Sequence, residues 1–492
     1  SGFKGQSLRY AEIGMAKSGS SSGRKGLGPK LRFNTLSVFV ALIVTSMSII
    51  LSSLSLMPPH NHYPDSHPLS MFDPANSRNP NYHMVFSTAC SPFQNWQAYM
   101  FFYHAWKVGQ RGSVTRLASG CKPEQQAEQQ KVFDEAIAPL SKNFHIHFTP
   151  DFSGPDNVKY FNKPFGLLHW MKNSLGYPHN SEQYDDDIIM ILDPDMMLLK
   201  PLTHIFNIDQ VYWVTQPINN ITTVRHGYPF AQLYGFAEQW KTCLRENMTY
   251  VVGADSPSQD VSIVDAAKYY PAGPPYLATG RDMFTLASQW TEFLPRVHEV
   301  FPEFMAEMHA YSLAAAHLQM PHQLASSFMV SDVGAQRLEG WDFLEDVERK
   351  DACGANVEAV HPNAPFVFHY CQRYAVGKWF VGKYKLREDF FTCEAPLLRE
   401  PPKDVSARYN WWIFPNEKEM QNYTEKEYRQ HEIVQHGWAM CKLIDALNEV
   451  AAYFKKKHCK ETANYTKVEI FHTAEKFEEF LQQGSYHGYG NK

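Results

Sequence analysis

The stretch DDDIIMILDPDMMLLKPL, residues 185–202, decides the fold prediction. Its apolar run IIMIL is short and uncharged, which is typical of a fully buried strand. Asp193 and Asp195 follow this run directly, whereas a second Asp-x-Asp pair, Asp185 and Asp187, precedes it. Because ligands of open α/β sheets bind beyond the carboxyl ends of the strands, we interpret the first pair as a candidate ligand site and the second as a solvated strand entry.

Two carboxylates separated by one residue suit a hard divalent cation such as Mn²⁺ or Mg²⁺, which keeps open positions for phosphate oxygens. Such a cation offsets the charge of a nucleoside diphosphate as it leaves. An Asp-x-Asp pair by itself is weak evidence, because a turn or a capping role explains it equally well. The metal interpretation therefore depends on the residues around Asp193 and Asp195.

Working outward, short β-branched or aromatic runs alternate with helical patterns. The strand-like runs are HMVFS at 83–87, FHIHF at 144–148 and IIMIL at 188–192, and the helical patterns lie at 96–108 and 163–173. Strands that alternate with helices indicate a mostly parallel sheet that is covered on both faces. The predicted fold class is therefore α/β.

The 492-residue chain has 46 basic and 51 acidic residues, a net charge of −5, but the charge is unevenly distributed. Residues 1–35 carry +6, which leaves −11 for residues 36–492. The uncharged segment 36–57 is about 33 Å long as a helix, enough to cross a bilayer. We expect a signal anchor with 1–35 in the cytosol and a lumenal remainder, and a cleaved signal peptide is the alternative. The acidic balance gives no reason to expect a nucleic-acid partner.

Cysteines and glycosylation sequons are consistent with a lumenal placement. All eight cysteines follow the apolar segment, which favours disulfides in an oxidising compartment, although the pairing cannot be deduced from their spacing. Four N-x-[ST] sequons lie in the same part of the chain, and each of them alone also arises by chance. They are Asn220, Asn247, Asn422 and Asn464.

The remaining segments complete the predicted organisation. Residues 58–80 hold six prolines and no hydrophobic periodicity, as expected of a semi-rigid stem. We place a catalytic domain at 81–400 and end it at Pro401 and Pro402. Beyond them, apolar residues recur at spacings of three and four from Val434 to Phe454, which predicts an amphipathic helix in a C-terminal extension, 401–492.

Five segments in a fixed order carry a family resemblance. They are HMVFSTACSPFQNWQAYMFFYHAWKVGQRGSVTRLASGC (83–121), FNKPFGLLHWMKN (161–173), IIMILDPDMMLLKPL (188–202), HGYPFAQLYGF (226–236) and EMHAYSLAAAHL (307–318). Together they resemble the plant and algal peptidyl serine α-galactosyltransferases and the related hydroxyproline O-arabinosyltransferases, over roughly residues 82–400. The resemblance implies a GT-A type (Rossmann-like) glycosyltransferase fold, a UDP-sugar donor, a divalent metal and a Golgi or ER membrane address.

The resemblance also implies roles for single residues. Asp193 and Asp195 match the metal-binding D-x-D, and His369, after the apolar run FVF, matches a late histidine that completes the metal site in glycogenin-type transferases. Gly377 and Lys378 resemble the phosphate-binding element that follows this histidine. For His369 the alternative is a hydrogen-bonded core residue.

Further candidates lie nearer the donor and the acceptor. Lys163 matches a lysine near the donor, where a cation would stabilise the leaving diphosphate, but a surface lysine at a helix start is the alternative. Glu307 is a candidate for orienting the sugar or the acceptor, or else a carboxylate at a helix start. Gly273 allows close backbone approach or simply a turn, and Ser87 and Thr88 contact the nucleotide or cap a turn.

These residues predict a retaining transferase that moves a sugar, galactose in the first instance, from a UDP-sugar to serine or hydroxyproline hydroxyls of secreted polypeptides. The Pro between Asp193 and Asp195 is closer to the arabinosyltransferases, which leaves UDP-arabinofuranose as an alternative donor. A catalytically silent glycan- or peptide-binding module on the same fold is the alternative from another functional class. A two-metal hydrolase is disfavoured, because the additional His and Asp clusters of such sites are missing from the sequence pattern.

Overall fold

The computed structural model describes residues 80–468, apart from 155, 180, 208–210, 212, 215–219, 355, 360, 378, 417, 418, 428 and 429. The predicted cytosolic tail, the predicted membrane segment 36–57 and nearly all of the stem lie outside the described residues, as does Lys378. Within the described part of the chain, no helix has the length and apolar character needed to cross a membrane.

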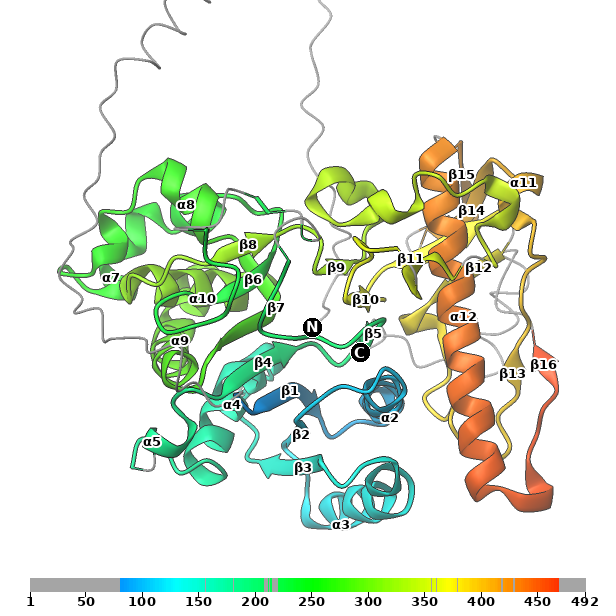
Figure 1. Ribbon diagram of the computed structural model, residues 1–492, viewed down its shortest axis with the longest axis horizontal. Coiled ribbons are helices and arrows are strands. Elements are labelled where there is room, and N and C mark those ends of the chain that lie inside the picture. The colour runs from blue at the N-terminus through cyan, green and yellow to red at the C-terminus, as the bar shows by residue number, and fades with distance from the viewer. Residues whose placement is uncertain are drawn as a thin grey trace, which may run out of the picture. The chain divides into compact units, whose positions relative to one another are not determined.

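A seven-stranded mixed sheet forms the centre of the molecule (Figure 1), in the order β3-β2-β1-β4-β7-β6-β8. Neighbouring strands are parallel except at β7, which is antiparallel to both β4 and β6. The predicted α/β class and the mostly parallel sheet are confirmed, and β7 is the antiparallel exception. The strands are β1 (Tyr82–Ala89), β2 (Ser113–Ser119), β3 (Phe144–Thr149), β4 (Ile188–Leu192), β6 (Phe230–Leu233), β7 (Ala272–Thr279) and β8 (Gln323–Ala325).

Helices cover both faces of this sheet, as alternation along β1 shows. Phe86 points into the core shared with α2, where it stacks on Phe101 at a centroid distance of 4.2 Å. Val85 points to the opposite face, into a second core that contains Trp170 of α4 and Trp290 of α9. The helices are α2 (Pro92–Lys107), α3 (Pro123–Val132), α4 (Asn162–Asn173), α5 (Ser181–Tyr184), α6 (Gln239–Thr242), α7 (Met248–Val252), α8 (Ile263–Tyr269), α9 (Gly280–Val300) and α10 (Ala306–His317).

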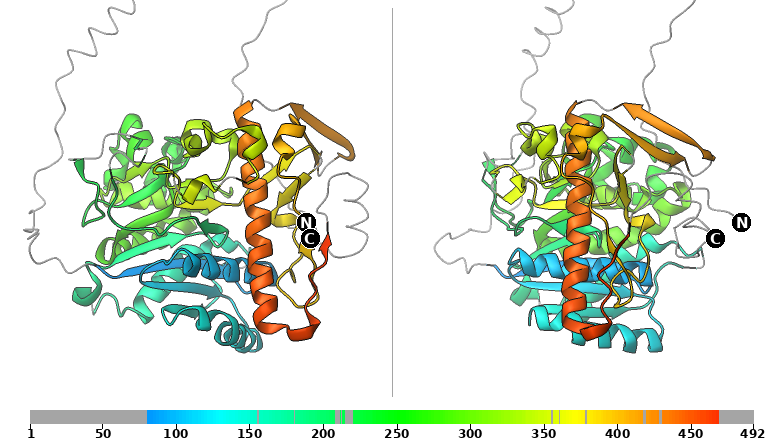
Figure 2. Two further views of the ribbon diagram at one scale, coloured as in Figure 1. Left: turned by 45° about the vertical axis from the view of Figure 1, so that its right-hand side comes forward. Right: turned by 90° about the vertical axis from the view of Figure 1, so that its right-hand side faces the viewer.

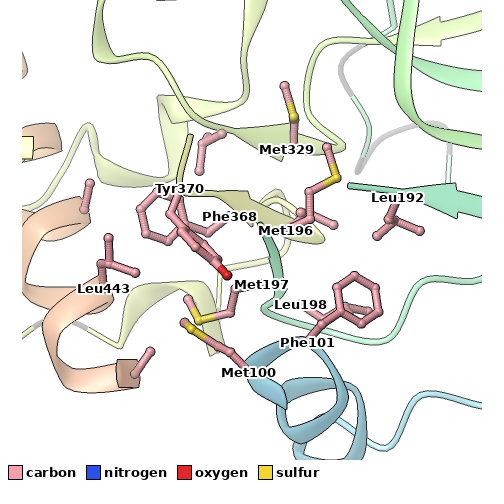
Figure 3. Close-up of a cluster of buried hydrophobic side chains, with 14 of the residues drawn as sticks. Met100, Phe101, Leu192, Met196, Met197, Leu198, Met329, Phe368, Tyr370 and Leu443 are labelled. Atoms are coloured by element: carbon pink, nitrogen blue, oxygen red, sulfur yellow. The ribbon is translucent and has the colours of Figure 1, made fainter. Parts of the chain in front are cut away.

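A small second sheet continues from the carboxyl end of β4. Strand β5 (Met196–Leu198) pairs antiparallel with β10 (Val367–His369), which pairs parallel with β9 (Met329–Val330). Figure 3 shows that Met196 and Phe368 of this sheet lie in one apolar cluster with Met100 of α2 and Leu443 of the C-terminal helix. The turn between β4 and β5, which holds Asp193 and Asp195, is thereby fixed on a rigid base.

The predicted C-terminal helix is present as α12 (Gln430–His458), the long helix at the right of Figure 1 and in front in the right-hand view of Figure 2. Its periodic residues Val434, Trp438 and Ile444 are buried in the same core as α2 and β10. The extension also contains strands that the periodicity did not predict. The elements of the extension besides α12 are α11 (Val405–Arg408), β14 (Trp411–Asn416), β15 (Glu419–Glu427) and β16 (Lys467–Val468). Strands β11 (Arg373–Val376), β12 (Trp379–Gly382) and β13 (Leu397–Leu398) precede it.

Three disulfides are present, which confirms the prediction that cysteines pair. Cys90 is bonded to Cys121, Cys353 to Cys441 and Cys393 to Cys459. The second bond joins α12 to an earlier segment, and the third joins Cys459, directly after α12, to another. The remaining cysteines, Cys243 and Cys371, are free thiols.

Candidate functional site

The two aspartates of the Asp-Pro-Asp turn lie where the sequence predicts, between the end of β4 and the start of β5. Asp195 is buried, and the side chain of Asp193 is 21% exposed. His369 reaches this turn because the β5–β10 ladder places it opposite Met196, the residue after Asp195. The amide of Tyr370 donates a hydrogen bond to the Asp195 carbonyl oxygen at 3.1 Å. Two segments that are far apart in sequence therefore meet in a fixed register.

One ligand atom each from Asp193, Asp195 and His369 lie within 4.8 Å of one another. His369 Nε2 is 3.3 Å from Asp195 Oδ1. Two carboxylates and an imidazole form a donor set that Mn²⁺ accepts, and a separation of about 3 Å is expected for two ligands of one ion at bond lengths of about 2.1 Å. The three residues predicted as metal ligands are thus brought together, and their chemistry fits a divalent cation.

Lys163, in the first turn of α4, connects this turn to a third carboxylate. Its Nζ lies 2.8 Å from Asp193 Oδ1 and 3.2 Å from Glu307 Oε2. Burial by itself lowers the pKa of Lys163, but the charges of Asp193 and Glu307 outweigh that effect and raise the pKa above its ordinary value. Lys163 is therefore a charged lysine inside the site and not a surface lysine at a helix start.

Glu307 lies in the first turn of α10, as predicted, and is buried. Burial raises the pKa of its carboxyl group, while the charge of Lys163 opposes the rise. Its Oε1 has no hydrogen-bond partner among the described residues. Because buried polar atoms normally have partners, Oε1 is free to accept a hydroxyl group of a bound ligand.

Lys383 is a site residue that the sequence did not indicate. It follows β12, is buried, and its Nζ contacts Asp195 Oδ2 in an ion pair. Burial alone raises the pKa of Asp195, but Lys383 and His369 outweigh it, so the pKa lies far below its ordinary value. Burial lowers the pKa of Lys383, and the Asp195 charge more than compensates. Lys383 is one of several lysines in a short segment, and no local pattern distinguishes it.

The residues predicted to follow the histidine have different surroundings. Gly377 adopts a φ of +57° between β11 and β12, and a Cβ there would lie 2.5 Å from the Tyr409 ring. The turn itself therefore requires glycine at this position. Lys378 lies outside the described residues, so its predicted contact with phosphate stays a prediction.

Gly273 lies within strand β7 and not in a turn, so the turn alternative for this residue is wrong. A Cβ at this position would be 1.9 Å from the Tyr234 ring, which shows that the glycine makes room for Tyr234. Burial raises the pKa of Tyr234 well above its ordinary value, and the charge of Asp193 adds to the rise. The sequence did not indicate that Gly273 makes room for Tyr234.

The two β1 candidates differ in their exposure. Thr88 is buried, where its Oγ1 accepts a hydrogen bond from Arg116 Nε at 2.8 Å and donates one to the Leu117 carbonyl at 3.3 Å. Ser87 is half-buried near the carboxyl end of β1. Thr88 therefore has a structural contact that occupies its hydroxyl, whereas Ser87 stays a candidate for donor binding.

A sequence comparison confirms the predicted resemblance. A stretch of 144 residues is 31% identical to a peptidyl serine alpha-galactosyltransferase from Arabidopsis thaliana, covering 28% of this chain and 16% of that protein's length. No family model matches the chain. Among solved structures, the crystal structure of an active-site mutant of LgtC is similar with a TM-score of 0.32 at 13% identity, covering 59% of this chain and 87% of that one.

Proposed function

We propose that this chain is a divalent-metal-dependent glycosyltransferase of GT-A type that transfers a sugar from a UDP-sugar to serine or hydroxyproline hydroxyls of secreted polypeptides. The observation that carries the proposal is the convergence of Asp193, Asp195 and His369 at the carboxyl end of β4. The similarity of one segment to a peptidyl serine galactosyltransferase supports the reaction class and makes galactose the first donor to test.

The proposed mechanism assigns a task to each group in the site. Asp193, Asp195 and His369 would hold the metal, which supplies Lewis-acid stabilisation of the leaving diphosphate when it is bound. The Lys163 ammonium adds a fixed positive charge at the same end of β4. The free Oε1 of Glu307 accepts a hydroxyl of the sugar or of the acceptor and so orients it.

Retention of configuration needs no strong protein base in this scheme. A leaving diphosphate oxygen takes the acceptor proton on the face where the new glycosidic bond forms, while the bond from the anomeric carbon to the diphosphate breaks. The three identified carboxylates support this scheme, because Asp193, Asp195 and Glu307 are each engaged by a lysine. Their role is to bind and orient and not to abstract a proton.

The proposal includes the subcellular location of the protein. We infer a single-pass type II protein of the Golgi or ER, anchored through 36–57 and carrying its catalytic domain, 81–400, in the lumen. The three disulfides support an oxidising compartment. The C-terminal extension, 401–492, is proposed to brace the small sheet, since α12 packs in the same core as β10.

A donor screen with the full chain tests the reaction. UDP-galactose and UDP-arabinofuranose are each incubated with a serine peptide and a hydroxyproline peptide in the presence of Mn²⁺, and sugar transfer is measured by mass spectrometry. We expect transfer from one donor, and the Asp195→Ala variant is expected to lose it. Asp185→Ala is the matched control, because Asp185 belongs to the second Asp-x-Asp pair at the opposite end of β4.

Each outcome of the screen is informative. Transfer by Asp195→Ala at the normal rate would remove the metal assignment. Absence of transfer together with absence of Mn²⁺-dependent UDP binding would favour the glycan- or peptide-binding module. Transfer from UDP-arabinofuranose alone would keep the reaction class and change the donor.

A further inference from the structure

Lys383 lies beside the candidate metal site and forms an ion pair with Asp195. This ion pair affects how a divalent cation and a nucleoside diphosphate bind. We propose that Lys383 is a fixed counter-ion for Asp195 that keeps the affinity for a free divalent cation low, so that metal and nucleoside diphosphate bind together. The inference rests on the proposed function and adds to it a residue that couples the two ligands. Lys383 is a positioning residue in this scheme, because it acts through the Asp195 carboxylate.

The charges of the site support this assignment. Asp193 and Asp195 each contact one lysine, Lys163 and Lys383 respectively. Lys163 also contacts Glu307, so three carboxylates face two ammonium groups, and most of their negative charge is compensated. All of these groups are largely withdrawn from water. A free cation therefore meets ligands whose charge is already compensated, and it is also repelled by two nearby ammonium groups. A nucleoside diphosphate brings the missing negative charge.

The backbone positions Asp195 and His369, two of the three proposed metal ligands, without help from Lys383. His369 is held opposite Met196 by the β5–β10 ladder, and the Tyr370 amide binds the carbonyl oxygen of Asp195. Lys383 contacts only Oδ2 of Asp195, on the side of the carboxylate away from the oxygen nearest His369. We therefore expect its removal to change the charge of the site much more than its geometry.

Lys383 itself is held in place. Its side chain is 11% exposed, and its Nζ lies 4.7 Å from the centroid of the Tyr384 ring. A cation over an aromatic face is stabilised further by the ring quadrupole. Lys163 is a poorer probe of the same effect, because it also binds Glu307 and its removal would disturb two carboxylates.

The test measures binding and not turnover. Mn²⁺ affinity is determined by electron paramagnetic resonance with and without saturating UDP, for the full-length wild type and for Lys383→Met. We expect UDP to raise the wild-type affinity for Mn²⁺ by at least about tenfold, a coupling of about 1.4 kcal/mol or more. In Lys383→Met, Mn²⁺ alone is expected to bind at least about tenfold tighter than to the wild type, with a smaller effect of UDP.

Two further variants complete the design. Lys383→Arg keeps the charge and is expected to keep the coupling. Lys455→Met removes another buried lysine, whose ammonium group donates to backbone carbonyls of Cys393 and Ala395 and contacts no carboxylate in the described structure, so Mn²⁺ binding should not change.

The outcomes separate the inference from the proposed function. If the wild type binds Mn²⁺ equally well with and without UDP, the inference is overturned whether or not Lys383→Met folds. If a folded Lys383→Met binds Mn²⁺ alone no more tightly than the wild type, Lys383 is not the coupling residue. If the wild type binds neither Mn²⁺ nor UDP, the proposed function itself fails.

Discussion

At the scale of single residues, Gly273 of β7 makes room for Tyr234, the residue that follows β6. A Cβ at Gly273 would lie 1.9 Å from the Tyr234 ring, so Gly273→Ala must displace that ring. We expect the free energy of unfolding to fall by about 1–3 kcal/mol, the usual range for overpacking. Sugar transfer is expected to fall as well, because the charge of Asp193 acts on the Tyr234 hydroxyl and a displaced ring would alter the electrostatics of the Asp-Pro-Asp turn. Denaturant unfolding and transfer assays check both.

Gly166 in α4 provides the matched control for that substitution. A Cβ there would have its nearest contact at 3.5 Å, an ordinary van der Waals distance. Gly166→Ala is expected to leave transfer unchanged and to raise the free energy of unfolding by up to about 1 kcal/mol, because alanine favours the helix. If both alanines had the same effect, the collision with Tyr234 would not be the cause.

The predictability of site residues depends on what surrounds them in sequence. Asp193 and Asp195 could be located because they follow an apolar strand, and His369 because it also ends one. Lys383 and Tyr234 could not, since their importance comes from contacts with Asp195 and Gly273 that only the folded chain creates. Periodicity encodes which residues are buried along one element, but not which elements meet.

At the scale of elements, the junction of β9, β10 and β11 holds the histidine of the site. The Tyr374 hydroxyl in β11 lies 2.7 Å from the Ser331 carbonyl oxygen and 3.3 Å from the His369 carbonyl oxygen. Tyr374→Phe removes this link and leaves buried acceptors without their donor. We expect the free energy of unfolding to fall by about 1–3 kcal/mol and the affinity for Mn²⁺ in the presence of UDP to fall, measured by denaturation and by spin resonance.

Tyr465→Phe serves as the comparison, because Tyr465 is 50% exposed and lies in the C-terminal extension. It is expected to change neither quantity. Loss of stability in Tyr374→Phe without any loss of Mn²⁺ affinity would show that the junction supports the fold but does not position His369.

The strands and helices of the central sheet and its mostly parallel character were predictable, whereas the direction of β7 was not. The patterns at 83–87, 144–148 and 188–192 correspond to β1, β3 and β4. The antiparallel direction of β7 depends on the path of the chain between β6 and β7, which periodicity does not encode. The β14–β15 hairpin of the C-terminal extension was missed, because the helical pattern at 434–454 dominated the interpretation of that extension.

At the scale of the whole molecule, the distribution of charge explains how a chain with a net negative charge would bind an anionic donor. Residues 36–492 carry −11, so the surface as a whole does not attract phosphate. At the site, Lys163 and Lys383 lie among three carboxylates and compensate most of their negative charge. Selectivity for a diphosphate would therefore come from a small preorganised cluster that a metal completes, and not from a basic surface.

Stability of the whole molecule is expected to depend on pH through Glu339. Burial raises the pKa of this carboxyl group to about 7 from an ordinary value of 4.5, although Ser331 and Asp332 donate hydrogen bonds to it. Between pH 4.5 and 7 the folded chain therefore holds a proton that the unfolded chain has released. Because the folded state binds more protons, the free energy of unfolding falls as the pH rises through this window, by an amount on the order of 3 kcal/mol.

Glu339→Gln isolates this contribution from that of the other titrating groups. Denaturant unfolding at pH 5 and pH 8 gives the free energy of unfolding of each chain at both pH values. The fall in this free energy from pH 5 to pH 8 should be smaller in the variant than in the wild type, by roughly 3 kcal/mol or less. The wild type is thus expected to be more stable relative to the variant at pH 5 than at pH 8. An equal pH dependence in both chains would mean that the hydrogen bonds from Ser331 and Asp332 keep Glu339 ionised in spite of its burial.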